Sequence, residues 1–269
     1  MVAMVDVGGY RLFANLDGDG PVVAWLTGIG EPWSSWSATL AQLGRPAARL
    51  VYDRGGVGAS EPVPEPQRPR PYSHFAEELA RLLVALNATE PVILVAHSFG
   101  CNIARVFARR YPTRVAGLVL AEPSMPYLAL WPGDDSYRID GDRADATHID
   151  PDRGGDEVLS LEISAPAVVL TRTPGRWRSP QATEAVDRDW RAAHCRLAAE
   201  LAAPHILAVN AGHQINYDAP ELVAHAVDRV IDAVSGAPLV FEPVRVNAVG
   251  GQLTKCPHPD LERNDTPGS

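Results

Sequence analysis

The chain has 269 residues, 46% of them hydrophobic, a length and composition that suit one large α/β domain with a buried core rather than two full domains. Its formal net charge of −9 opposes nonspecific binding to nucleic acid or to anionic lipid. No stretch approaches the ~18 apolar residues of a membrane span, and residues 1–10 lack the basic start and apolar run of a signal peptide, so we expect a cytoplasmic protein.

The N-terminal region predicts an antiparallel hairpin followed by a central strand. Residues 2–7 and 10–16 have the composition of two paired strands, separated by a Gly-Gly turn. Residues 21–26 form an apolar run that continues directly into Thr27-Gly28-Ile29-Gly30, where glycine permits a close backbone approach. A helix is then expected from the spacing of Trp33, Trp36, Leu40 and Leu43.

A glycine-rich run follows the next predicted strand, residues 49–52. It reads Asp53-Arg54-Gly55-Gly56-Val57-Gly58-Ala59-Ser60, and its glycine spacing is similar to that of a dinucleotide-binding loop. Such a loop opens directly onto a helix, whereas residues 61–71 contain five prolines and no helical period. We therefore interpret the run as a tight surface turn and expect no cofactor there. Helical patterning resumes at Ser73, the predicted N-cap.

The segment around Ser98 organises the rest of the chain. Residues 92–95 are an unbroken apolar run, typical of a strand buried on both faces, and helix-spaced apolar residues begin four positions after Ser98. So sharp a turn needs small neighbours, which Ala96 and Gly100 provide. Ala-His-Ser-Phe-Gly differs at one residue from the Gly-x-Ser-x-Gly nucleophile elbow. Such a turn exposes the Ser98 hydroxyl to a base, and the alternative is a buried serine that starts a helix.

The second half of the chain continues to alternate strands and helices. The expected elements are a strand at 115–121 ending at Glu122, a strand at 166–171, a helix at 182–201, a strand at 205–209 and a helix at 220–234. This alternation predicts a mainly parallel, doubly wound α/β sheet whose ligands lie at the carboxyl ends of the strands. We expect one domain over residues 1–249, with a small mobile cap at about 125–159 and a loose tail at 250–269.

One of the eight histidines is placed to act on Ser98. His213 follows a predicted strand end and a glycine, so its side chain can face the same crevice as Ser98. His97 should point to the opposite side of its strand end, and His225 lies within a helix. The remaining histidines are expected on the surface or in the cap: His74, His148, His194, His205 and His258.

Four segments together resemble the α/β-hydrolase fold superfamily over about residues 22–234. They are the loop 27–30, the run 52–60, the elbow around Ser98, and Ala211-Gly212-His213 followed by Asp218-Ala219-Pro220. The resemblance implies that Ser98 is a nucleophile and His213 its base. It also implies that Asp53 stabilises its own turn. Thr27 departs from the histidine that usually stands at its position.

The third member of the implied triad requires a choice. In many members of the superfamily the acid follows the strand that is here 166–171, but residues 172–178 contain no carboxylate. Other members carry the acid after the preceding strand, which Glu122 ends, and this preserves the order serine, acid, histidine. We therefore assign Glu122. Asp187 and Asp189 are poor substitutes because the helical pattern carries them away from the strand end.

The resemblance also implies an oxyanion hole and a substrate pocket. The amide of Phe99 would be one oxyanion donor and the amide of Ile29 the other. Apolar side chains that could line a pocket are Trp33, Tyr127, Leu128 and Trp131, with Trp36 and Leu130 nearby in sequence. Aromatic residues at such spacing are as often part of a core.

The predicted function is hydrolysis of a carboxylic ester or lactone, with a small apolar substrate and an acyl-enzyme intermediate. A thioesterase, a carbon–carbon hydrolase, a lyase or a ligand-binding protein could use the same fold. No metal or organic cofactor is expected. Cys101, Cys195 and Cys256 are widely spaced and odd in number, so we expect reduced thiols and neither a disulfide framework nor a zinc site.

Overall fold

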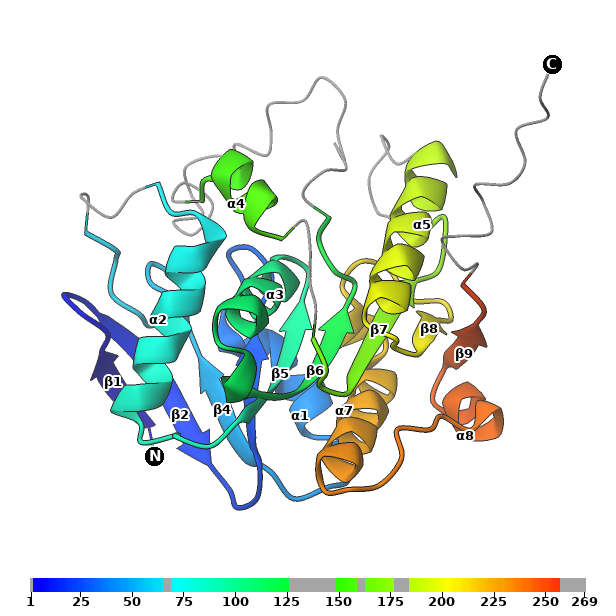
Figure 1. Ribbon diagram of the computed structural model, residues 1–269, viewed down its shortest axis with the longest axis horizontal. Coiled ribbons are helices and arrows are strands. Elements are labelled where there is room, and N and C mark those ends of the chain that lie inside the picture. Colours follow the sequence, from blue (N-terminus) through cyan, green and yellow to red (C-terminus); the bar gives the residue numbers. More distant parts are fainter. Residues whose placement is uncertain (1, 65–68, 126–148, 159–162, 177–183, 257–269) are drawn as a thin grey trace.

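The computed structural model describes residues 2–64, 69–125, 149–158, 163–176 and 184–256 (Figure 1). Its centre is a nine-stranded sheet in the order β1-β2-β4-β3-β5-β6-β7-β8-β9. The strands are β1 (Val2–Asp6), β2 (Arg11–Asp17), β3 (Val22–Leu26), β4 (Ala48–Tyr52), β5 (Val92–His97), β6 (Val115–Ala121), β7 (Ala167–Arg172), β8 (His205–Ala208) and β9 (Gly251–Thr254). The α-helices are α1 (Ser37–Leu40), α2 (Tyr72–Ala85), α3 (Phe99–Arg110), α4 (Pro151–Glu157), α5 (Glu184–Glu200), α6 (Ile215–Asp218), α7 (Pro220–Val234) and α8 (Pro243–Ala248), with short 3-10 turns η1 (Trp33–Trp36) and η3 (Pro112–Arg114).

The sheet is mainly parallel, as the alternating pattern predicts. β4, β3, β5, β6, β7 and β8 run parallel to one another, and the two antiparallel additions lie at the edges. At one edge β2 and then β1 pair antiparallel, forming the expected hairpin, and at the other edge β9 pairs antiparallel with β8. The carboxyl ends of the central strands therefore meet along one side of the sheet.

Both faces of the sheet are buried. Successive apolar side chains of a central strand point to opposite faces, and helices cover each face. In β3, Ala24 and Leu26 pack in a core shared with α2, α3 and part of α5. Val23 and Trp25 point to the other face, where α7 and η1 cover them. All six residues of β5 are buried, which explains why this strand has a continuous rather than an alternating apolar sequence.

The C-terminal part of the sheet corrects two expectations. Residues 250–269 were expected to be a loose tail, but Gly251–Thr254 forms β9. The cysteines were expected to be reduced, but Cys195 and Cys256 form a disulfide across 61 residues of sequence. A four-residue strand is too short to show a period, and the spacing of two distant cysteines carries no information about their contact. Residues 257–269 lie outside the described part.

The described part of the expected cap packs on α2. Gly154 of α4 lies against the ring of Tyr72, and the amide of Ser73 donates a 2.7 Å hydrogen bond to Glu157 Oε2. Ser73 is therefore not the N-cap: α2 begins at Tyr72, and its N-cap residue is Pro71. Residues 126–148 of the cap lie outside the described residues. Among the helices that the structure does describe, none is long and apolar enough to cross a membrane.

Candidate active site

Ser98 lies in a strained turn between β5 and α3. Its backbone has φ 50° and ψ −118°, a combination that L-residues rarely adopt. The turn is tied to the next strand, because the Ser98 amide donates to the carbonyl of Ala121 over 3.1 Å. The small neighbour is required: a Cβ atom at Gly100 would lie 2.6 Å from the carbonyl oxygen of Leu26. This geometry is that of the nucleophile elbow expected from the sequence.

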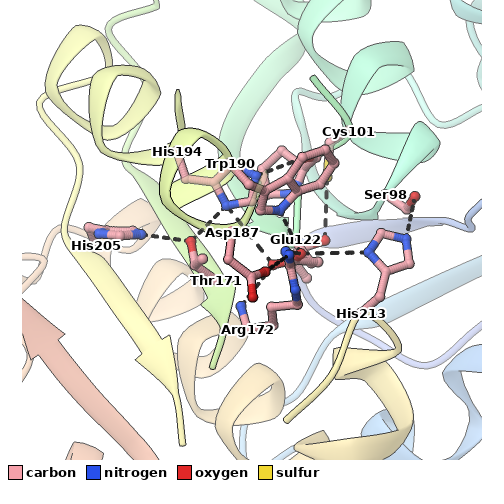
Figure 2. Close-up of polar contacts among 12 residues, drawn as sticks. Ser98, Cys101, Glu122, Thr171, Arg172, Asp187, Trp190, His194, His205 and His213 are labelled. Atoms are coloured by element: carbon pink, nitrogen blue, oxygen red, sulfur yellow. Dashed lines mark hydrogen bonds and ion pairs between the residues drawn. The ribbon is translucent and has the colours of Figure 1, made fainter. Parts of the chain in front are cut away.

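His213 reaches Ser98 from the loop between β8 and α6. Its Nε2 lies 3.0 Å from Ser98 Oγ, close enough for a hydrogen bond (Figure 2). Burial lowers the pKa of His213 below its usual 6.5, although Glu122 opposes the shift. The imidazole is therefore neutral at neutral pH, and its Nε2 is able to accept the serine proton.

Glu122 lies on the other side of the His213 ring. It directly follows β6, is fully buried and has φ 52°. Its Oε1 is 3.6 Å from His213 Nδ1, just beyond hydrogen-bond distance. The structure thus brings Ser98, His213 and Glu122 into one row, as Figure 2 shows.

Glu122 is held by groups that sequence reasoning missed. Its Oε2 accepts from the amide of Arg172 over 2.8 Å, and its Oε1 accepts from the Arg172 guanidinium and from Trp190 Nε1, each over 2.6 Å. Burial alone would raise the pKa of Glu122, but its interaction with His213 and the charge of Arg172 lower that pKa to about 2. The carboxylate stays ionised inside the core.

Asp187 supports Glu122 indirectly, through Arg172. The helical pattern was expected to carry Asp187 away from the strand end, but its carboxylate lies at the end of β7. It pairs there with the second guanidinium nitrogen of Arg172 and accepts from the amide of Gly175. The end of β7, where the sequence has no carboxylate, therefore supplies Arg172, the cation that pairs with Glu122 at the end of the neighbouring strand β6. Only the folded chain brings α5 against β7, so no local sequence signal reveals these partners.

A second acid–histidine pair lies behind His213. His97 Nδ1 is 3.2 Å from Glu31 Oε2, and its Nε2 donates to the backbone carbonyl of His213 over 2.8 Å. Burial opposes charge on His97, but Glu31 raises its pKa above the usual value, and His97 in turn lowers the pKa of Glu31 to about 2. His97, which was expected to point to the opposite side of its strand end from Ser98, has its ring centroid 5.1 Å from that of His213 and contacts the loop that carries His213.

The loop expected to contribute to the oxyanion hole is fixed by Arg54. The Arg54 guanidinium donates to the carbonyls of Thr27 and Gly28, over 2.8 Å and 2.5 Å, and to Thr27 Oγ1. Arg54 is buried, so the run that begins at Asp53 is not simply the surface turn we expected. Ile29 is half-buried in this loop. Phe99 is the first residue of α3, and amides of a helix's first turn lack helical partners.

Asp53 stabilises the same region through hydrogen bonds to two backbone amides. Its Oδ1 accepts from the amide of Trp33 over 2.7 Å, and its Oδ2 accepts from the amide of Ala59 over 2.9 Å. These bonds join the turn after β4 to η1, which is a structural role of the kind expected for Asp53.

The predicted pocket residues divide into two groups. Trp33 stacks on Phe13 of the hairpin, with ring centroids 6.3 Å apart. Trp36 is fully buried against Trp25, so it belongs to the core and not to a pocket. The other predicted pocket residues lie outside the described residues: Tyr127, Leu128, Leu130 and Trp131.

Two further histidine predictions are wrong. His194 and His205 were expected on the surface or in the cap, but both are buried. Burial lowers the pKa of His194 to about 4 and the pKa of His205 to about 3, so both are neutral. The α5 helix turns His194 toward the sheet, and His205 is covered on the other side by β9, the strand that the sequence did not predict.

The described residues also line a cavity of about 720 Å³ along α5. Its lining includes Glu184, Asp187, Arg188 and Arg191 but neither Ser98 nor His213. The cavity meets the candidate site through Asp187, which pairs with Arg172.

Comparisons with known proteins agree with this architecture. The family described as alpha/beta hydrolase fold matches residues 21–143. An uncharacterised protein of Bacillus subtilis (strain 168), YqjL, is 23% identical over 218 residues, which cover 77% of this chain and 82% of YqjL. The putative carbamate hydrolase RutD of Pantoea ananatis is 34% identical over 112 residues, but the match covers only 41% of this chain and 39% of RutD.

Among solved structures, the enol-lactonase of Burkholderia xenovorans LB400 superposes with a TM-score of 0.61 at 19% identity. The superposition covers 86% of this chain and the whole of that protein. The sheet order, the turn at Ser98, the family match and this superposition all lead to one assignment. The chain has the α/β-hydrolase fold.

Proposed function

We propose that the protein is a serine hydrolase that cleaves a carboxylic ester or lactone through an acyl-enzyme intermediate. The observation that carries the proposal is the contact between His213 Nε2 and Ser98 Oγ at 3.0 Å, with Glu122 on the far side of the ring. A neutral imidazole in hydrogen-bond reach of a hydroxyl is the arrangement that nucleophilic catalysis by serine requires.

In the proposed mechanism Ser98 Oγ attacks the carbonyl carbon while His213 Nε2 takes its proton. The amides of Phe99 and Ile29 stabilise the oxyanion, and Glu122 stabilises the imidazolium. His213 then returns the proton to the leaving oxygen. Water, activated by the same imidazole, attacks the acyl group and releases the acid.

The named relatives support carbonyl chemistry of this kind. Carbamates and enol lactones, the compounds named for RutD and for the Burkholderia enzyme, are both attacked at a carbonyl carbon. The low identities do not transfer either substrate to this chain. We propose a small, apolar substrate because an excess of acidic residues does not favour anionic esters.

Replacing the nucleophile tests the mechanism. Ser98→Ala should fold normally, lose turnover of aryl esters and no longer react with a fluorophosphonate probe, because the only atom that bonds to the acyl group is gone. The matched control is Ser235→Ala, since Ser235 caps the far end of α7 and its hydroxyl bonds only within that helix. Full esterase activity in Ser98→Ala would rule out this mechanism.

A graded series of esters and lactones would define the substrate class in the wild-type protein. Turnover should rise with the apolar size of the acyl group or ring over the first few members, since apolar contact adds binding free energy. A preference for acetyl esters alone would contradict the proposed class, while leaving the role of Ser98 intact.

A further inference from the structure

A cluster of two sulfur atoms and one histidine lies where α5, β8 and Cys256, the second residue after β9, meet. Cys195 and Cys256 form a disulfide there, and His205 Nδ1 lies 3.5 Å from Cys195 Sγ and 3.1 Å from Cys256 Sγ. The three atoms lie within 4.8 Å of one another. His205 is buried, and the acyl-transfer mechanism makes no use of it.

The orientation of the protons on His205 follows from its neighbours. His194 Nε2 lies 2.8 Å from the carbonyl of Pro123, and because a carbonyl only accepts, Nε2 carries the proton. The neutral His194 then accepts at Nδ1 from Thr171 Oγ1, 2.7 Å away. The Thr171 oxygen in turn accepts from His205 Nε2, also 2.7 Å away. In neutral His205 the proton is therefore on Nε2, and Nδ1 presents a lone pair.

That lone pair faces the two sulfur atoms. Thr254 Oγ1 lies 2.6 Å from Nδ1 and 3.2 Å from the carbonyl of His205, so its hydroxyl is able to donate to either acceptor. Nδ1 can thus be released while Thr254 keeps a hydrogen bond. A histidine with one nitrogen fixed by a hydrogen bond and the other within 3.5 Å of two cysteine sulfurs has the arrangement of a metal ligand.

We propose that reduction of the disulfide turns this cluster into a site for a divalent cation of the zinc class, ligated by Cys195 Sγ, Cys256 Sγ and His205 Nδ1. The reductant is a dithiol, which is itself oxidised to a disulfide and supplies two electrons and two protons to the two sulfurs. Both cysteine thiols then lose their protons as the thiolates bind the cation. The fourth position is left to water or to a further ligand.

The geometry needs little change to accept such a cation. Tetrahedral zinc with Zn–S of about 2.3 Å and Zn–N of about 2.0 Å places nitrogen and sulfur ligands about 3.5 Å apart. The observed nitrogen–sulfur separations of 3.5 Å and 3.1 Å are already near this value. The remaining adjustment is for the two sulfurs to separate from bonding distance to about 3.8 Å.

A route to the cluster exists along α5. Cys195 lines the cavity of about 720 Å³, together with four basic residues, Arg188, Arg191, Arg196 and Lys255, and two acidic residues, Glu184 and Asp187. Basic residues outnumber acidic ones in this lining, and an excess of positive charge near a thiol favours its thiolate, which is both the leaving group when a disulfide is reduced and the form that binds metal.

Cobalt(II) provides a direct test, because thiolate ligation gives it a near-ultraviolet charge-transfer band and intense visible bands. The full chain would be reduced with a dithiol, freed of reductant under argon and titrated with Co²⁺, in parallel with the oxidised chain. The reduced chain should bind one Co²⁺ with thiolate bands and release it to Zn²⁺, and the oxidised chain should show neither. Absence of these bands from the reduced wild-type protein would overturn the proposal.

Variants assign the ligands. Cys256→Ser and His205→Gln should each lose the bands, and Cys101→Ala should keep them, since Cys101 is the buried thiol outside the cluster. Thr171→Val, which removes the hydrogen bond to His205 Nε2, should weaken Co²⁺ binding by roughly 10- to 100-fold. If Cys256→Ser and His205→Gln both bound Co²⁺ as the wild type does, the metal would lie elsewhere and the assignment would be wrong.

Stability provides a second readout that does not depend on activity. Zn²⁺ should raise the melting temperature of the reduced wild-type chain and leave that of the oxidised chain unchanged, because a ligand stabilises only the state that binds it. If the two cysteines serve only as a structural disulfide, Zn²⁺ should leave the melting temperature unchanged in both the reduced and the oxidised chain.

Discussion

The carboxylate of Glu122 satisfies two conflicting demands, because it is fully buried and yet remains ionised next to His213. Arg172 and Trp190 reconcile these demands by donating three hydrogen bonds between them. A separate, geometric requirement is that the side chain reach the imidazole from the end of β6, which the longer glutamate makes possible. The substitution Glu122→Gln removes the charge of this side chain and keeps nearly the same shape.

Glu122→Gln should lower turnover by up to about four orders of magnitude, because a neutral amide does not stabilise the imidazolium and does not enforce its tautomer. Slow acylation by a fluorophosphonate probe should persist, since Ser98 and His213 remain in contact. Steady-state kinetics on an aryl ester measure the effect, with Glu90→Gln on the surface as control. Turnover near the wild-type value would remove Glu122 from the proposed triad.

Glu31 and His97 are positioning residues in this scheme. Glu31 Oε2 accepts from the amide of Gly28, and His97 donates to the carbonyl of His213, so the pair connects the proposed oxyanion loop to the proposed base. Glu31→Gln should lower kcat roughly tenfold to a hundredfold with little change in KM, because small displacements of reacting groups are expensive. Glu31→Asp should recover part of the loss. An unchanged kcat in Glu31→Gln would show that the pair serves stability alone.

The sequence alone could predict only those residues of the candidate site that follow the ends of strands. Ser98, Glu122 and His213 each come directly after a strand or its loop, and the order of strands in a parallel sheet brings such positions together. Arg172, Trp190, Glu31 and His97 enter through contacts between elements that are distant in sequence. Their roles depend on which helix face meets which strand, and a single sequence does not specify that.

At the scale of elements, α4 is docked through a close contact. Gly154 packs on Tyr72, whose ring also packs edge-on against Phe99 with centroids 5.2 Å apart. The cap helix is thus connected through one aromatic ring to the residue that follows the proposed nucleophile.

Gly154→Ala should displace α4, because its Cβ would overlap the Tyr72 ring, and overpacking typically costs about 1–3 kcal/mol. Urea unfolding should show the loss, and KM for larger esters should rise as Phe99 shifts. Asp156→Ala is the matched control, since Asp156 is exposed on the same helix. A variant as stable as the wild type would show that α4 adjusts without strain.

The elements that sequence periodicity predicts well are long or continuous. β5 and α7 appear within two residues of their expected bounds because their own apolar residues indicate how they pack. β9 is missed because its four residues gain their stability from pairing with β8. The start of α2 shifts to Tyr72 because Glu157, far along the chain, takes the amide of Ser73.

For the whole molecule, buried neutral histidines set the response to acid. Folding holds the pKa of His194 at about 4 and that of His205 at about 3, whereas unfolded histidine titrates near 6.5. Below pH ~6.5 the unfolded chain therefore binds protons that the folded chain refuses, and stability falls as pH falls. Glu122 and Glu31, both with pKa lowered to about 2, add a further loss below pH ~4.5.

The free energy of unfolding should therefore decrease steadily from pH 7 to pH 4. Urea titrations at fixed ionic strength measure it, and His194→Gln should flatten the slope because it removes one of the two buried histidines whose pKa falls to about 4 or about 3. A wild-type unfolding free energy that is constant between pH 7 and pH 5 would contradict the buried, neutral state of both.

Ser98 and Glu122 have one further property in common. Both follow adjacent parallel strands, and both have positive φ, 50° and 52°, where a side chain strains the backbone by about 1–2 kcal/mol and glycine does not. At these two positions backbone strain favours glycine, whereas the proposed triad requires serine and glutamate. Descendants of this chain released from their chemical task would be expected to drift toward glycine at both positions, and homologues that have kept serine and glutamate there would show that the task has been maintained.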